Sequence, residues 1–136
     1  MSVRKPRLLD SWALLAYLRG EPEAGEVRQL LQRARAGKDE VLMSIINLGE
    51  VYYQLHREFG ESYAQQKLDE IRTLPLTIAA ASDDLVIAAA RVKARNAMSF
   101  ADCFAVATAL EHNAVVVTGD PEFKSVENVV KVQWLQ

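Results

Sequence analysis

Four acidic side chains stand out because each lies where one predicted element gives way to the next. Asp10 and Asp120 each follow a short apolar run, and Glu50 lies one turn into a predicted helix behind another such run. Asp102 lies near the start of residues 100–110, where almost every other side chain is apolar or small. A helix that is apolar on nearly every face packs inside a core, so this carboxyl reaches water only if a cleft opens beside it.

Each of these acids also has a plain structural explanation, because acidic side chains often cap the first turn of a helix. Asp10 could cap the helix that begins at Ser11, and Asp120 precedes a proline suited to a first helical position. The other two acids fit the spacing of capping boxes, Ser99-x-x-Asp102 and Asn47-x-x-Glu50. Taken alone, each acid is more simply a cap. Four carboxylates that meet at one place, however, repel one another and require a cation between them.

The ligand types indicate which cation such a site would hold. All four candidates are hard oxygen donors, and neutral oxygens lie near them in the sequence at Ser11, Asn47 and Thr118. Oxygen-only sets favour Mg²⁺ or Mn²⁺. Zinc is disfavoured because the chain's single cysteine and two histidines show no ligand spacing.

Composition sets broad limits on the kind of protein. With 136 residues, half of them hydrophobic, the chain is expected to fold as one domain over residues 1–136. A net charge of −2 and a pI of about 5.7 give no strong basic field for nucleic acid. The single cysteine excludes an internal disulfide, and no signal peptide or membrane span is visible. We therefore expect a cytoplasmic protein that does not enter the membrane.

Short apolar runs alternate with amphipathic segments along the whole chain. The runs predict strands at residues 7–10, 41–46, 74–79 and 115–117, with a weaker fifth at 129–132. Helices are predicted from Ser11, from Pro22, from about Asn47, and over residues 63–73, 83–95 and 100–110. This alternation predicts an α/β fold with a parallel sheet covered on both faces. Pro75 favours an edge position for the third strand.

In such a sheet, ligands bind beyond the carboxyl ends of the strands. Asp10 and Asp120 follow strands directly, and Glu50 follows one closely, so the three are expected at that edge. The helix that carries Asp102 follows another helix, so its arrival at the same edge is an inference.

Four segments in order resemble a known family: LLDSWALLAYL, SIINLGEVYY, SFADCFAVATAL and VVVTGDPEF. They resemble PIN-domain ribonucleases and, more narrowly, the VapC-type toxins of toxin–antitoxin pairs, over essentially the whole chain. The resemblance implies a three-layer α/β/α sandwich with a parallel sheet of four to five strands. It also implies bound Mg²⁺ or Mn²⁺, an RNA substrate, a small VapB-like antitoxin as partner, and a homodimer.

Carried over by position, the family's acidic site falls on Asp10, Glu50, Asp102 and Asp120, with Ser11 and Thr118 in supporting positions. Trp12 is bulkier than the residue expected beside the first acid. The resulting hypothesis is a metal-dependent endoribonuclease, the toxin of a VapBC-type pair. Asp10, Asp102 and Asp120 would hold one metal, and Glu50 would complete the site.

Two other classes of protein remain open on the sequence. A catalytically idle PIN-like interaction module would keep the fold without needing all four acids. A haloacid-dehalogenase-like phosphatase also begins with an acid at a strand end and has a later Gly-Asp pair. It requires a second acid two residues after the first, and Trp12 occupies that position. The phosphatase is the weaker alternative.

Overall fold

The computed structural model describes residues 4–136. The strands are β1 (Arg7–Leu9), β2 (Val41–Ser44), β3 (Thr77–Ala79), β4 (Val115–Thr118) and β5 (Val132–Trp134). The helices are α1 (Ser11–Leu18), α2 (Ala24–Arg35), α3 (Ile45–Phe59), α4 (Glu61–Ile71), α5 (Asp83–Arg95), α6 (Phe100–His112) and the 3-10 helix η1 (Pro121–Val126).

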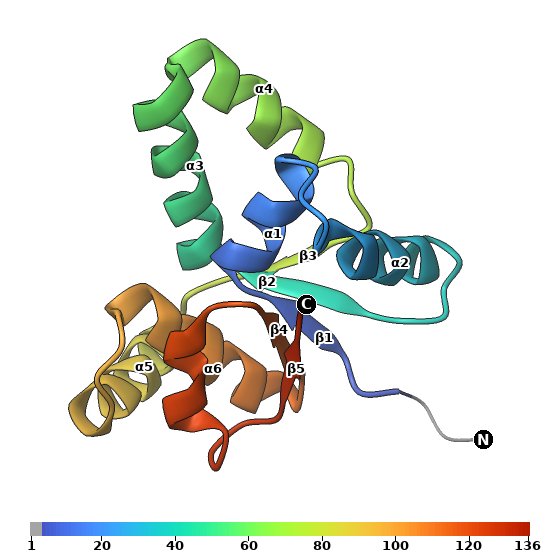
Figure 1. Ribbon diagram of the computed structural model, residues 1–136. Helices are drawn as coiled ribbons and strands as arrows, with labels where there is room; N and C mark the ends of the chain where they lie inside the picture. Colours follow the sequence, from blue (N-terminus) through green and yellow to red (C-terminus); the bar gives the residue numbers. More distant parts are fainter. Residues whose placement is uncertain (1–3) are drawn as a thin grey trace.

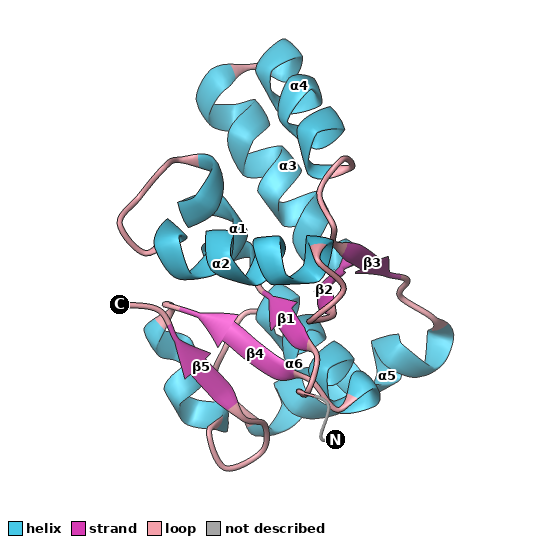
Figure 2. Cartoon of the chain, turned by 90° about the vertical axis from the view of Figure 1, so that its right-hand side faces the viewer, coloured by secondary structure: helices cyan, strands magenta, loops and turns pink. Residues whose placement is uncertain are grey.

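The five strands form one parallel sheet in the order β3-β2-β1-β4-β5. Helices α1 to α4 lie on one side of the sheet, and α5 and α6 lie on the other (Figures 1 and 2). The fold is therefore a three-layer α/β/α sandwich, as predicted. The third strand lies at the edge, as Pro75 indicated.

Alternate residues of the central strands pack into different hydrophobic cores on opposite sides of the sheet. Leu8, Leu42 and Val116 pack with α5 and α6, whereas Leu9, Val41 and Val117 pack with α1 and α2. These residues are all at most 2 % exposed. Both faces of the strands are buried, which explains why the strand sequences show apolar runs instead of alternation.

The topology fixes where a ligand can bind. After β1 the chain forms β2, which pairs with one edge of β1, and it later forms β4, which pairs with the other edge. The strand order therefore reverses between β1 and β4, which flank the switch point of the sheet. Ligands of open parallel sheets bind at this place, beyond the carboxyl ends of the strands. Residues Asp10 and Gly119 follow these two strands directly.

The sequence prediction is wrong by two residues at the junction between β2 and α3. The strand was predicted over residues 41–46 and the helix from about Asn47. The strand ends at Ser44, whose hydroxyl accepts a hydrogen bond from the Ile46 N–H at 3.2 Å and caps the helix. The β-branched pair at residues 45 and 46 resembled a strand, but the cap outweighs that propensity.

The outer strands are also shifted. The third strand covers residues 77–79 instead of 74–79, because residues 74–76 form a tight turn in which the Leu76 N–H bonds the Leu74 carbonyl at 2.7 Å. The fifth strand covers residues 132–134 instead of 129–132. There Val129 and Val130 both donate to the Val126 carbonyl in a turn, which delays the strand.

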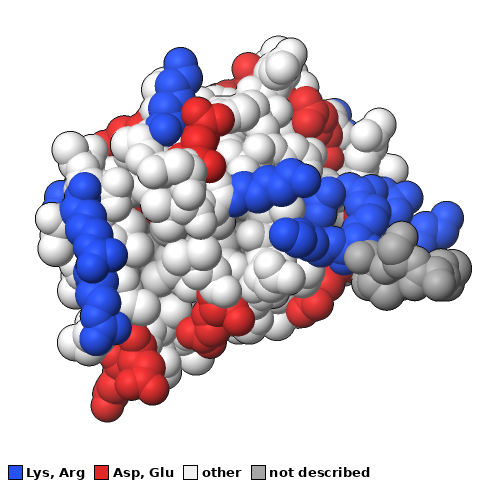
Figure 3. Space-filling view, turned by 90° about the horizontal axis from the view of Figure 1, so that it is seen from below, with Lys and Arg blue, Asp and Glu red and all other residues white. Residues whose placement is uncertain are grey.

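Basic and acidic side chains are interspersed on the face seen in Figure 3. Its Lys and Arg side chains form several groups, the largest of them contiguous and at one end, with acidic side chains among them. Within residues 4–136, no helix combines the length and the apolar character needed to cross a membrane.

Candidate functional site: an acidic cleft

Asp10 lies at the junction of β1 and α1 and is 1 % exposed. Its Oδ1 accepts a hydrogen bond from the Ala13 N–H at 2.8 Å, which makes it the N-cap of α1. Its Oδ2 accepts a hydrogen bond from the Thr118 hydroxyl. The cap predicted from the sequence is confirmed, and it holds the carboxyl at the end of the central strand.

Thr118 connects the ends of the two central strands. While its hydroxyl donates to Asp10, its Oγ1 accepts a hydrogen bond from the Asp120 N–H at 2.9 Å. Asp120 in turn accepts from the Glu122 N–H at 3.0 Å and caps η1, as predicted. One hydroxyl thus sets the relative position of two of the predicted acids.

Glu50 approaches from α3. Its Oε1 accepts a hydrogen bond from the Ser11 hydroxyl, which also lies 3.2 Å from the Asn47 carbonyl oxygen. The predicted capping box between Asn47 and Glu50 is wrong, because Ser44 caps this helix and Asn47 lies inside it. Instead, the buried Asn47 amide donates to the Ala101 carbonyl at 3.0 Å and ties α3 to the start of α6.

Asp102 lies in the first turn of α6, where its N–H donates to the Ser99 hydroxyl at 3.2 Å. The side chains from Asp102 to Ala109 are buried, as the sequence predicted for this helix. Asp102 itself is 6 % exposed and lines a cleft, which is the route to water that an acid in an apolar helix requires.

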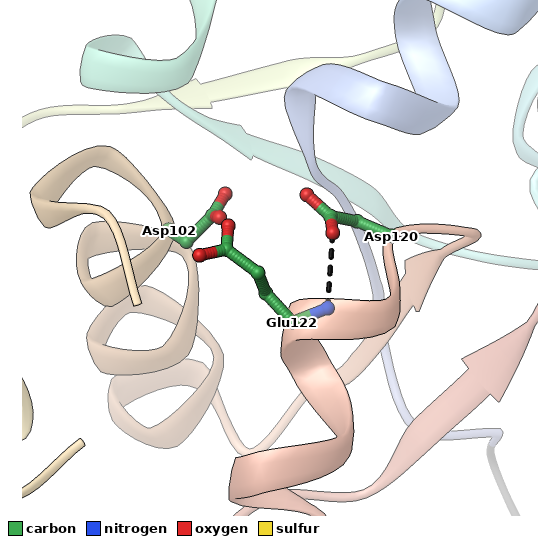
Figure 4. Close-up of side chains that lie close together, drawn as sticks. All are labelled: Asp102, Asp120 and Glu122. Carbon is green, nitrogen blue, oxygen red and sulfur yellow. Dashed lines mark hydrogen bonds between the residues drawn. The ribbon is translucent and has the colours of Figure 1, made fainter. Parts of the chain in front are cut away.

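Glu122 belongs to the acidic group although it is not among the residues predicted from the sequence. One carboxylate oxygen each from Asp102, Asp120 and Glu122 lie within 4.8 Å of one another, and in Figure 4 the three side chains converge from α6 and the start of η1. The available signal was local: Asp-Pro-Glu places a second acid two residues after a capping acid, at the start of a helical turn.

These side chains line a cleft of about 350 Å³ at the carboxyl edge of the sheet. Of the predicted residues, Ser11, Glu50, Asp102 and Asp120 contribute to its wall. Asp10 and Thr118 do not line it and are buried next to it, where both oxygens of Asp10 already accept hydrogen bonds from the protein. The three-acid cluster thus includes Glu122 and not Asp10, and Glu50 lines the same cleft.

The electrostatics of the cleft disfavour ionised carboxyls. Burial raises the pKa of Asp10 to about 7, with further increases from Asp120 and Glu50, although bonds from Thr118 and Ala13 oppose the shift. Burial also raises the pKa of Asp102 to about 8, and the neighbouring Glu122 carboxyl adds to the increase. Both acids would ionise more readily beside a cation.

The donor set fits a hard divalent cation. Oxygen ligands around Mg²⁺ at 2.0–2.1 Å lie roughly 3–4 Å apart. The three converging oxygens lie within 4.8 Å of one another, so small side-chain movements would bring them around one ion. The candidate ligands are all oxygens, which favours Mg²⁺ or Mn²⁺ over a thiophilic metal.

The sequence matches the PIN domain family over residues 7–129. The chain therefore belongs to the PIN domain family. A search of curated protein sequences finds no match.

Solved structures of toxin–antitoxin proteins share the fold. A chain of VapBC2 from Rickettsia felis, bound to a DNA fragment from its promoter, has a TM-score of 0.75 at 18% identity, over 96% of this chain and 98% of that one. VapBC-1 from nontypeable Haemophilus influenzae has a TM-score of 0.70 at 18% identity, with 94% and 96% covered. VapC20 of Mycobacterium tuberculosis, a sarcin–ricin loop cleaving toxin, has a TM-score of 0.68 at 20% identity, with 88% and 94% covered. At these identities the similarity establishes the fold.

Proposed function

We propose that the protein is a metal-dependent endoribonuclease and the toxin of a VapBC-type toxin–antitoxin pair. The observation that carries the proposal is the convergence of Asp102, Asp120 and Glu122 in a cleft at the switch point of a PIN domain. The similar VapC20 structure belongs to an RNA-cleaving toxin, which supports RNA as the substrate class. We also propose that residues 1–136 form a single domain; residues 1–3 lie outside the described part.

The residues of the chain have separate roles in this proposal. Asp102, Asp120 and Glu122 would hold Mg²⁺ or Mn²⁺. The buried Asp10 carboxyl, which interacts electrostatically with Asp102 and Asp120, would add negative charge that favours the cation. When bound, the metal lowers the pKa of a water molecule and neutralises charge on the phosphate oxygens. Glu50, whose orientation is set by Ser11, lines the same cleft and would orient the attacking water. Thr118 positions Asp10 and Asp120.

The direct test is cleavage of purified ribosomal and transfer RNA in Mg²⁺ or Mn²⁺, with and without chelator. We expect cleavage that stops in chelator and falls at least 100-fold in Asp102→Asn. Asp84→Asn is the matched control, because Asp84 is an exposed acid in the first turn of a different helix, α5, and does not line the cleft. Metal-independent cleavage, or full activity of Asp102→Asn, would exclude this assignment.

The partner proposal has its own test. Chains of similar fold occur in complexes of VapBC and FitAB, which supports a small VapB-like antitoxin as partner. A short reading frame directly upstream that encodes a DNA-binding amino terminus would supply the candidate. Its co-expression should relieve growth arrest caused by the wild-type chain and yield a stable complex. We further propose a homodimer, which light scattering of the purified protein would detect.

A further inference from the structure

Trp12 has an environment that the acidic site does not explain. It is the second residue of α1, is partly exposed, and packs with one part of its ring against the core beneath α2 that includes Val27 and Leu31. It also lines the acidic cleft together with Asp102 and Asp120. An indole that is anchored on one side and open to a cleft on the other presents a fixed aromatic surface.

Gly119 provides the space for this ring. A Cβ at residue 119 would overlap three atoms of the six-membered ring of Trp12, with Cζ2 at 2.6 Å. The glycine is therefore required by the close approach of the indole, which lies directly over the backbone before Asp120. The ring position is fixed relative to the acids and does not depend on a flexible loop.

Residues of α1 and its C-cap that line the cleft share one helical face. Trp12, Leu15, Ala16 and the C-cap residue Arg19 are spaced i, i+3, i+4 and i+7, and they line the cleft together with Ser11. Arg19 is the one cation among the described residues that line it, and Arg19 already pairs with Glu58 at 2.8 Å. The cleft therefore offers an RNA chain little basic charge, whereas contacts to phosphate normally supply much of the affinity.

We propose that Trp12 is a stacking platform for the base of an unpaired nucleotide next to the phosphate that the acidic cluster engages. This inference rests on the proposed nuclease function and names the surface that supplies its substrate affinity. Stacking requires a base that is free of its own helix, so the substrate class is single-stranded or loop RNA. Aromatic stacking tolerates any base and can replace affinity that a basic groove would otherwise give.

A kinetic comparison separates stacking from core packing. We expect Trp12→Leu to raise KM for a short single-stranded RNA by about tenfold with a smaller change in kcat, and Trp12→Phe to retain most of the affinity. Tyr17→Leu is the matched control, because Tyr17 lies on the same helix and packs against the same core but does not line the cleft. An unchanged KM in Trp12→Leu, or an equal rise in Tyr17→Leu, would overturn the proposal.

Fluorescence gives a readout that needs no cleavage. The chain has two tryptophans, and Trp134 lies outside the cleft, bonded to Glu127 at 3.0 Å. In a Trp134→Phe, Asp102→Asn protein, emission from Trp12 should be quenched by a single-stranded RNA. The same RNA with abasic nucleotides beside the cleavage point should bind with less quenching. Equal quenching by both RNAs would contradict stacking.

The two proposals can fail separately. If the wild-type protein cleaves no RNA in Mg²⁺ or Mn²⁺, the nuclease assignment fails, and the fluorescence titration still decides whether Trp12 stacks on a base. If cleavage is normal and chelator-sensitive but Trp12→Leu behaves as wild type, the stacking platform alone is wrong.

Discussion

The hydroxyl of Thr118 donates to Asp10 Oδ2 across the two central strands and accepts from the N–H of Asp120. It is 0 % exposed, so this arrangement is shielded from competing water. A charged acceptor strengthens a hydrogen bond, and the Thr118 bond opposes the burial that raises the pKa of Asp10. The polar residue at the end of β4 therefore holds both acids in place and favours the ionised form of one of them.

Replacement of Thr118 by valine keeps the shape of the side chain and removes the hydroxyl. We expect the pKa of Asp10 to rise further and the Mg²⁺ midpoint of cleavage to increase roughly tenfold, because the more easily protonated carboxyl is a weaker partner for a cation. Thr118→Ser, which restores the hydroxyl, should recover most of the wild-type midpoint. A metal titration of cleavage by Thr118→Val that coincides with the wild-type curve would contradict this role.

The acidic site should make the metal-free protein less stable as pH rises. Folding raises the pKa of Asp10 to about 7 and that of Asp102 to about 8, from an ordinary value of 3.8. Between about pH 4 and pH 8 the folded state thus binds more protons than the unfolded state, and the free energy of unfolding falls with rising pH. We expect the Tm in chelator to fall across this interval and Mg²⁺ to restore it at pH 8.

Asp10→Asn should separate stability from activity. Asparagine can still cap α1 at Ala13, but it carries no buried charge. We expect the variant to unfold a few degrees above wild type at pH 8 in chelator, with little difference at about pH 3, where Asp10 is largely protonated in both the folded and the unfolded state. Cleavage should be lost. A lower Tm for Asp10→Asn at pH 8 would show that the buried charge is already compensated within the protein.

Gly119→Ala should be destabilising because its Cβ overlaps the Trp12 ring. Forced overpacking of this kind costs about 1–3 kcal/mol. The double variant Gly119→Ala, Trp12→Ala should show no additional cost from the added methyl group, so the two substitutions should be strongly non-additive in urea unfolding. Additive effects would mean that the glycine is required for a reason unrelated to the indole.

The sequence predicted the layers, the parallel sheet and the edge where the acids meet, because these follow from apolar runs that alternate with amphipathic helices. It failed where a side-chain hydrogen bond overrides propensity, as at Ser44, which ends β2 two residues early. It also missed Glu122, because the approach of this side chain to Asp102 depends on the packing of η1 against α6, which local spacing does not contain.

Two buried polar side chains on neighbouring helices, when replaced by apolar ones, should change the free energy of unfolding in opposite directions. Asn47 is 0 % exposed and its amide holds the Ala101 carbonyl, which lies directly before Asp102. Asn47→Ala leaves that carbonyl without its partner, so we expect a loss of about 1–3 kcal/mol and slower cleavage. Thr108 is equally buried and lies farther along α6. Within residues 4–136 its hydroxyl has no hydrogen-bond partner, and neither does Asn47 Oδ1, so the Thr108 side chain, unlike Asn47, makes no hydrogen bond to lose. Thr108→Val removes an unsatisfied polar group of the same shape and should raise stability by roughly 1 kcal/mol with cleavage unchanged. Urea unfolding and RNA cleavage of both variants test the pair. If Asn47→Ala loses stability yet cleaves at the wild-type rate, the bond to Ala101 holds the fold together without positioning Asp102.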